Sequence, residues 1–130
     1  MARKASKYPT ELELEILKVL WQEGACSVSQ VRKALVGVRD LAHTSVMTIM
    51  SIMADKGYVT RSKEGNRFIY QASLAEQDTS SSMLGDLVDR LFSGSAAAAM
   101  VSLLETSDLD AGELAELKQL IHSKSKERKA

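Results

Sequence analysis

The chain has 130 residues, of which 45% are hydrophobic, and these values fit one globular domain with a helical extension rather than a disordered protein. Its one cysteine, Cys26, excludes an internal disulfide, and His43 and His122 lie far apart with no other metal ligand at suitable spacing. We therefore expect no metal and no cofactor. Because no apolar run reaches transmembrane length and no signal-peptide core follows the basic N-terminus, we expect a cytoplasmic protein without membrane insertion.

The net charge is zero, but the charges are distributed unevenly along the chain. Residues 1–72 contain 11 lysines and arginines against 7 aspartates and glutamates, whereas residues 73–130 contain 6 against 10. The first part is therefore basic and the second part acidic. This asymmetry suggests that only the first part contacts a polyanion.

Two sequence patterns mark the beginning of helices in the basic part. Thr10–Glu13 reads T-x-x-E, the pattern of a capping box, and apolar residues then recur at three- and four-residue spacing until Gly24. This predicts a helix over 11–23. Ser27–Gln30 repeats the pattern as S-x-x-Q and predicts a second, short helix that ends near Gly37.

A third helix is predicted over about 42–56, with Gly57 in the left-handed conformation just after its end. Its helical periodicity separates a buried stripe from an outward stripe of small hydroxyl side chains. The side chains expected to face the core are Val46, Ile49, Met50 and Met53. The opposite face carries Thr44, Thr48, Ser51 and Asp55, with Met47 and Ile52 on its flanks.

The next two segments favour β-structure. Residues 58–63 and 67–72 are joined at 64–66, where Gly65 and Asn66 tolerate a positive φ, and this pattern predicts a hairpin. The rest of the chain has helical periodicity. Helices are predicted from Thr79 or Ser80 to Phe92, over 95–104, and from the cap-like Asp110 to about 123.

Three helices followed by a hairpin are the element order of a winged helix-turn-helix, in which the hairpin is the wing. The predicted fold is therefore mainly α with a small β-hairpin wing. We expect a winged-helix DNA-binding domain over 8–73 and a helical dimerisation region over 74–123. Flexible charged tails are expected at 1–7 and 124–130.

The third helix suits insertion into the major groove of DNA. Short hydroxyls meet phosphates or base edges at close range, Met47 suits a thymine methyl group, and free N–H groups at the helix start favour a phosphate. Basic side chains near the hairpin turn and in the N-terminal arm suit sequence-independent phosphate contact. The predicted DNA-binding residues are His43, Thr44, Ser45, Met47, Thr48 and Ser51 in the helix, Arg61, Lys63 and Arg67 in the wing, and Arg3 and Lys4 in the arm.

The helices after residue 73 are too few to bury their own apolar stripes, because small helical segments rarely form a core alone. Pairing with a second copy of the chain would bury these stripes, and we expect a homodimer. The residues predicted in its interface are Met83, Leu87, Leu91, Met100, Leu103, Leu104, Leu117 and Leu120.

Three stretches of the sequence resemble the penicillinase-repressor family: ELEILKVLW (13–21), LAHTSVMTIMSIMADKGYV (41–59) and NRFIYQA (66–72). The resemblance is strongest over 8–72 and continues more loosely to about 123. It implies a winged-helix repressor that binds double-stranded operator DNA of dyad symmetry as a homodimer. The C-terminal helices would form the dimer. It also implies an upstream signal, a membrane sensor protease or a metal, that relieves the repression.

The sequence departs from the family's pattern at three places. Relatives usually carry a basic residue at Ile52 and often another at Asp55, so the third helix is less cationic here. The C-terminal cysteine cluster of the copper-sensing branch is missing, and Ser102-Leu103 stand where protease-cleaved relatives carry Asn-Phe. Neither inducing route is therefore supported by the residues present.

Two other classes of function were open to this sequence. The missing basic residues at Ile52 and Asp55 favour, as an alternative, a winged-helix module for protein–protein assembly without an operator. An enzyme is not expected, because the sequence has no Ser–His–Asp set, phosphate loop, zinc motif or paired-carboxylate cleft. We expect Cys26 to be a small buried hydrophobe, and Trp21 and Tyr70 to belong to the core.

Overall fold

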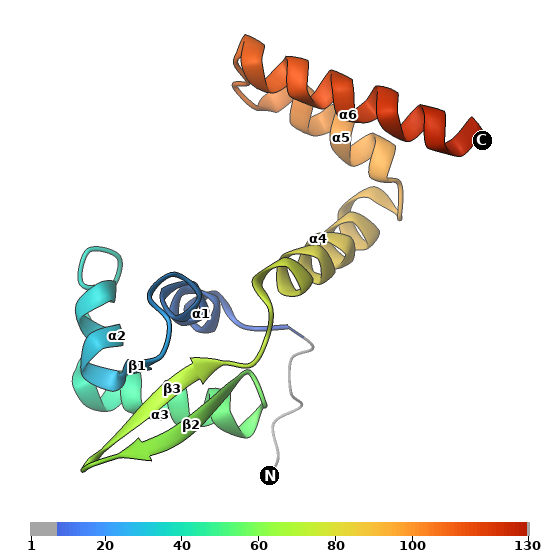
Figure 1. Cartoon of the computed structure of the whole chain (residues 1–130). Helices are drawn as coiled ribbons and strands as arrows, with labels where there is room; N and C mark the ends of the chain where they lie inside the picture. Colours follow the sequence, from blue (N-terminus) through green and yellow to red (C-terminus); the bar gives the residue numbers. More distant parts are fainter. Residues whose placement is uncertain (1–7, 130) are drawn as a thin grey trace. The chain divides into compact units, whose positions relative to one another are not determined.

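The structure is a computed structural model that describes residues 8–129. The chain divides into two compact units, Met1–Leu84 and Gly85–Ala130, and each is described by itself. The elements of the first unit follow the predicted order of a winged helix-turn-helix (Figure 1). They are α1 (Glu11–Glu23), β1 (Cys26–Ser27), α2 (Val28–Leu35), α3 (His43–Asp55), β2 (Val59–Glu64) and β3 (Arg67–Ala72).

Reciprocal side-chain caps begin the first two helices, as the sequence predicts. The amide of Glu13 donates to the Thr10 hydroxyl at 3.2 Å, and the amide of Thr10 donates to the Glu13 carboxylate at 2.8 Å. Ser27 and Gln30 make the same pair of bonds at 3.3 and 2.8 Å. Each box satisfies two amides that the helix itself leaves without an acceptor, which fixes where α1 and α2 begin.

The core of the first unit is formed by one face of each of its three helices and by β3. Its largest fully buried side chains are Ile16, Leu17, Val31, Val46, Met50, Met53 and Tyr70. Tyr70 is therefore a core residue, as predicted. Trp21 is half-buried at the edge of this core, where its indole N–H donates to the Leu74 carbonyl at 2.8 Å.

The sheet has three antiparallel strands in the order β1-β3-β2, of which β1 was not predicted. In β1, Cys26 pairs with Tyr70 and Ser27 pairs with Ile69. Cys26 is buried, and this burial, together with the charge of Glu23, raises the pKa of the thiol. The thiol therefore stays protonated, and its role as a small hydrophobe is confirmed.

The hairpin of β2 and β3 closes through Gly65 and Asn66, so its turn is one residue shorter than predicted. Glu64 belongs to β2 and pairs with Arg67. Gly65 has φ of 65°, whereas Asn66 is not in the positive-φ region. A glycine with positive φ at the first of two turn positions is the pattern of a II′ turn, whose twist matches that of the strands.

The remaining helices are α4 (Glu76–Phe92), α5 (Ala96–Thr106) and α6 (Ala111–Lys129). The prediction placed the start of α4 at Thr79 or Ser80, and the helix in fact begins at Glu76. Thr79 is buried inside the helix, where its hydroxyl donates to the Ala75 carbonyl at 2.9 Å instead of capping an end. Acidic Glu76 and Asp78 in the first turn suit the positive end of the helix dipole.

The second unit leaves most of its apolar side chains uncovered. Of residues 85–129, only Ala99 is buried. Helix α6 runs to Lys129, past residue 123 where the predicted helix ends, because lysine, glutamate and arginine favour helix and basic side chains suit its last turn. Within residues 8–129, no single helix has the length and apolarity needed to cross a bilayer, although α4 and α5 taken together pass that test as a bent pair.

Candidate nucleic-acid interface

Helix α3 has one face in the core and one face in solvent. Val46, Met50 and Met53 are fully buried, which holds the helix firmly against the rest of the unit. Ile49, the fourth residue predicted to face inward, is half-buried against the same core. The opposite face exposes His43, Thr44, Ser45, Met47 and Thr48, whereas Ser51 is half-buried. His43 is itself the first residue of α3.

The start of α3 differs from the starts of α1 and α2 because no side chain caps it. Its N-cap residue is Ala42, which makes no side-chain hydrogen bond to the helix. The first amides of a helix have no acceptor within the helix, and the first residues of α3, His43, Thr44 and Ser45, are exposed. Such amides, at the positive end of the helix dipole, favour a phosphate group.

The hydroxyl of Thr48 is already engaged within the helix. It donates to the Thr44 carbonyl at 2.9 Å, a bond that spacing along the sequence does not reveal. Thr48 therefore offers a ligand its oxygen lone pairs and its methyl group rather than its proton. This narrows the predicted role of Thr48 to an acceptor or an apolar contact.

The end of α3 turns sharply into β2 through Gly57, whose φ is 82°. The amide of Gly57 donates to the Ala54 carbonyl at 3.1 Å, and the amide of Tyr58 donates to the Met53 carbonyl at 2.9 Å. These two bonds form a Schellman motif, in which the left-handed residue is glycine because a Cβ is unfavourable there. The predicted helix end at Gly57 is confirmed.

An ion pair joins the C-cap of α3 to the beginning of α1. The ammonium group of Lys56 donates to the Glu13 carboxylate at 2.9 Å, and it also lies 5.6 Å from the centre of the Tyr58 ring. The Glu13 side chain is only 4% exposed, while the Lys56 side chain is 24% exposed. Glu13 therefore has two roles, because the same carboxylate caps α1 through Thr10 and fixes the end of α3.

The capping role of Glu13 was predicted from the sequence, but its ion pair with Lys56 was missed, although a signal for a buried partner was present. Glu13 stands three, four and seven residues before Ile16, Leu17 and Leu20, so it occupies the apolar stripe of α1. A carboxylate in such a stripe requires a buried partner. The partner, Lys56, lies 43 residues away, and no local pattern identifies it.

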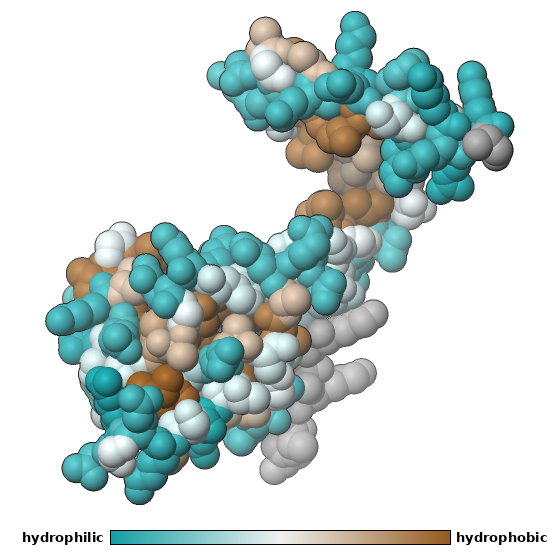
Figure 2. Space-filling model, viewed as in Figure 1, coloured by the Kyte–Doolittle hydropathy of each residue, from teal (hydrophilic) through white to brown (hydrophobic). Residues whose placement is uncertain are grey.

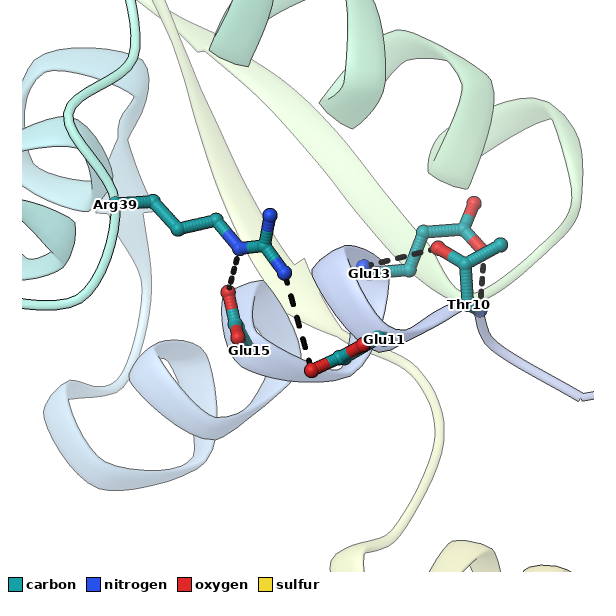
Figure 3. A network of polar contacts seen from close by, with 5 residues as sticks. All are labelled: Thr10, Glu11, Glu13, Glu15 and Arg39. Atoms are coloured by element: carbon teal, nitrogen blue, oxygen red, sulfur yellow. Dashed lines mark hydrogen bonds and ion pairs between the residues drawn. The ribbon is translucent and has the colours of Figure 1, made fainter.

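A second ion pair fixes the segment that leads into α3. The guanidinium of Arg39 donates to the Glu15 carboxylate at 2.8 Å and lies 3.9 Å from that of Glu11 (Figure 3). From α2, Arg32 donates through Nε to the Leu41 carbonyl of the same segment at 2.8 Å. Both ends of α3 are thus connected to α1 by charged side chains, which sets its position on the core.

The wing presents its cations on two faces. In the register of the hairpin, Lys63 pairs with Phe68 and Arg67 pairs with Glu64. Because side chains alternate along a strand, Arg61, Lys63 and Phe68 share one face, and Arg67 lies on the other. The Arg61 guanidinium stacks 4.9 Å from the centre of the Phe68 ring. All three predicted wing cations are exposed.

The N-terminal arm completes the list of predicted contact residues. Arg3 and Lys4 lie outside the described residues. Their contact with DNA stays a prediction, as do the base and phosphate contacts assigned to α3 and the wing.

Known proteins resemble the chain over nearly its whole length. It is 24% identical over 120 residues to a penicillinase repressor of Bacillus licheniformis, covering 92% of this chain and 94% of the relative. It is 20% identical over 112 residues to the methicillin resistance regulatory protein MecI of Mammaliicoccus sciuri, covering 86% and 91%. Among solved structures, Bordetella bronchiseptica BpsR has the same fold, with a TM-score of 0.51 and 14% identity over 94% of this chain and 83% of that one.

The sequence model of the penicillinase repressors matches residues 9–123, which include every helix and strand of the first unit and most of the second. The resemblance noted from three short stretches thus extends across both units. The family consists of transcriptional repressors, which are not enzymes. This chain belongs to the penicillinase repressor family.

Proposed function

We propose that this chain represses transcription in the cytoplasm by binding double-stranded operator DNA, with α3 in the major groove and the wing on the phosphate backbone. One observation carries the proposal: α3 exposes an uncapped N-terminus and a row of hydroxyls while its other face is locked in the core. A rigid helix with short outward side chains approaches base edges closely. The wing supplies the cations that α3 lacks.

A gel shift at two salt concentrations tests this proposal. The probes are the DNA upstream of the chain's own gene and a random duplex of equal length. We expect a specific complex that weakens steeply as salt rises, because bound phosphates release counterions. No shift at low salt would instead support the alternative, a winged-helix module for protein–protein assembly.

Lys63→Ala is expected to weaken binding to both probes equally and to reduce the salt slope by about one. The reason is that Lys63 is exposed on the wing with no ion pair among those found in residues 8–129. Arg67→Ala, on the opposite face, serves as the comparison. A reduced slope for Arg67→Ala alone would place that other face of the wing on the DNA.

Replacing Thr44 and Thr48 together by alanine is expected to weaken operator binding far more than binding to random DNA. Each lost base contact is worth roughly 1–3 kcal/mol of discrimination. Thr106→Ala is the matched control, because Thr106 makes the same backbone hydrogen bond in α5, to Ser102 at 2.7 Å. Equal losses on both probes would show that the two threonines only position the backbone.

We also propose that the working form is a homodimer. Seven of the eight residues predicted in the interface are more than a third exposed: Leu87, Leu91, Met100, Leu103, Leu104, Leu117 and Leu120. Met83 is half-buried. Apolar surface is visible over the C-terminal helices in Figure 2. So many exposed leucines on amphipathic helices favour burial against a second copy, which would set two α3 helices about one DNA turn, roughly 34 Å, apart.

The most specific expectation drawn from the family resemblance is that a membrane sensor protease relieves the repression. The Ser102–Leu103 bond lies inside α5, where the backbone is hydrogen-bonded as helix. Cleavage there requires local unfolding of α5 before the protease can act. We propose only that an upstream signal, carried by a sensor protease or by another route, relieves the repression, and limited proteolysis of the chain would show whether this bond becomes accessible to a protease.

A further inference from the structure

The outward surface of α3 lacks the side chains that usually read guanine. Arginine and lysine recognise guanine by donating to its O6 and N7 atoms, and α3 contains neither residue. The nearest basic residue on the C-terminal side, Lys56, is turned inward and bound by the buried carboxylate of Glu13. The one cation at the end of α3 therefore pairs with a buried carboxylate of the fold and is not presented to DNA.

Two large apolar side chains are exposed on α3 instead. Met47 is 43% exposed and Ile52 is 44% exposed, although three other side chains of the same helix are fully buried in the core. By the helical periodicity they lie on opposite flanks of the row formed by Thr44 and Thr48. Among residues 8–84, no part of the fold buries either side chain, so the surface that would enter the groove combines hydroxyls with apolar groups.

In the major groove, the C5 methyl group of thymine is the base feature that matches an apolar side chain. We propose that α3 reads thymine methyl groups through Met47 and Ile52, two contacts that add to the base discrimination expected from Thr44 and Thr48. This inference rests on the proposed binding of operator DNA and adds what the operator must present. The half-site offers thymines to this helix, and guanines there are not read by it.

The charges of α2 and the wing fit a division of roles in which these elements contact phosphates and α3 contacts bases. Apart from Lys18 on α1, the exposed basic side chains among residues 8–84 lie on α2 and the wing, at Arg32, Lys33, Arg61, Lys63 and Arg67. Cations at those places attract the backbone of any duplex without distinguishing bases. The apolar contacts of α3 would then discriminate between bases, because burying one methyl group changes affinity by about fourfold.

The experiment begins with selection by the full-length chain from a random duplex library. The selected duplex is then synthesised with thymine and with uracil, which pairs identically and lacks only the methyl group. We expect about a fourfold loss of affinity for each contacted methyl group removed. Replacing guanine by 7-deazaguanine in the same duplex is expected to leave binding by α3 unchanged.

Protein variants assign the effect to residues. With Met47→Ala or Ile52→Ala, affinity for the thymine duplex should fall while affinity for the uracil duplex stays the same. Val36→Ala is the matched control, since Val36 is a 61% exposed apolar residue just after α2 and outside α3. It should leave the ratio of the two affinities as in the unchanged chain. Both helix variants alter exposed side chains, so circular dichroism should show an intact fold.

Two results would overturn the inference while leaving the proposed function in place. One is equal affinity of the chain for the thymine and uracil duplexes. The other is a selected site whose guanines, once changed to 7-deazaguanine, weaken binding that Met47→Ala and Ile52→Ala do not affect. Failure to enrich any duplex at low salt is a different outcome, because it would contradict operator binding itself and this inference with it.

Discussion

Lys56→Met is expected to destabilise the winged-helix unit by about 3 kcal/mol, because it leaves the Glu13 carboxylate charged and buried without its partner. For a unit of this size the melting temperature should fall by about 15 °C. Trp21 is the only tryptophan and packs at the edge of the core of this unit, so its fluorescence reports the unfolding directly. Urea denaturation of the full chain measures the free energy of unfolding.

The double variant Glu13→Gln with Lys56→Met separates the lost charge pair from lost packing. Glutamine removes the charge and still accepts a hydrogen bond from the Thr10 amide, since either residue completes a capping box. We expect the double variant to recover most of the stability. If it is as unstable as Lys56→Met alone, the contact of the Lys56 ammonium with the Tyr58 ring matters more than its pair with Glu13.

Arg39→Met is the matched control, because it removes a more exposed ion pair whose acidic partners, Glu15 and Glu11, lie on α1 as Glu13 does. Its side chain is 40% exposed, and solvent screens its interaction with Glu15 and Glu11. The expected loss is therefore below about 1 kcal/mol. A loss as large as that of Lys56→Met would contradict the claim that burial of Glu13 makes its pair the stronger one.

The parts of the fold that follow local rules were predictable from the sequence. The capping boxes at Thr10 and Ser27 and the glycine after α3 depend on residues three or four apart, and the structure confirms all three. The buried stripe of α3 follows from helical periodicity in the same way. Such features depend only on residues within about one helical turn of each other, so a short sequence pattern is enough to specify them.

The features that were missed depend on partners distant in sequence. Strand β1 has only two residues, and its pairing with β3 exists because the folded helices bring Cys26 beside Tyr70. The ion pair of Lys56 with Glu13 arises in the same way. For the candidate site this difference is important, because periodicity placed the hydroxyls of α3 outward but could not show that Lys56 pairs with Glu13.

Leu87→Asp is expected to convert the proposed dimer to monomer. Leu87 is 42% exposed on α4 within the second unit, a unit in which Ala99 is the sole buried residue among 85–129. An aspartate there would bring an unpaired charge into an apolar interface, which costs several kcal/mol. Operator affinity should fall by about 100-fold or more, because each half-site is then bound without the effective concentration that the partner provides.

Equilibrium sedimentation at micromolar concentration gives the mass, and a gel shift on the operator gives the affinity. Gln119→Asp is the control, since it adds the same charge at an exposed polar position of α6 outside the predicted interface. A Leu87→Asp chain that stays dimeric would move the interface away from α4, and the exposed leucines of α5 and α6 would be the next to test. A monomer with unchanged operator affinity would contradict the dyad mode of binding, because one α3 helix would then suffice for the whole site.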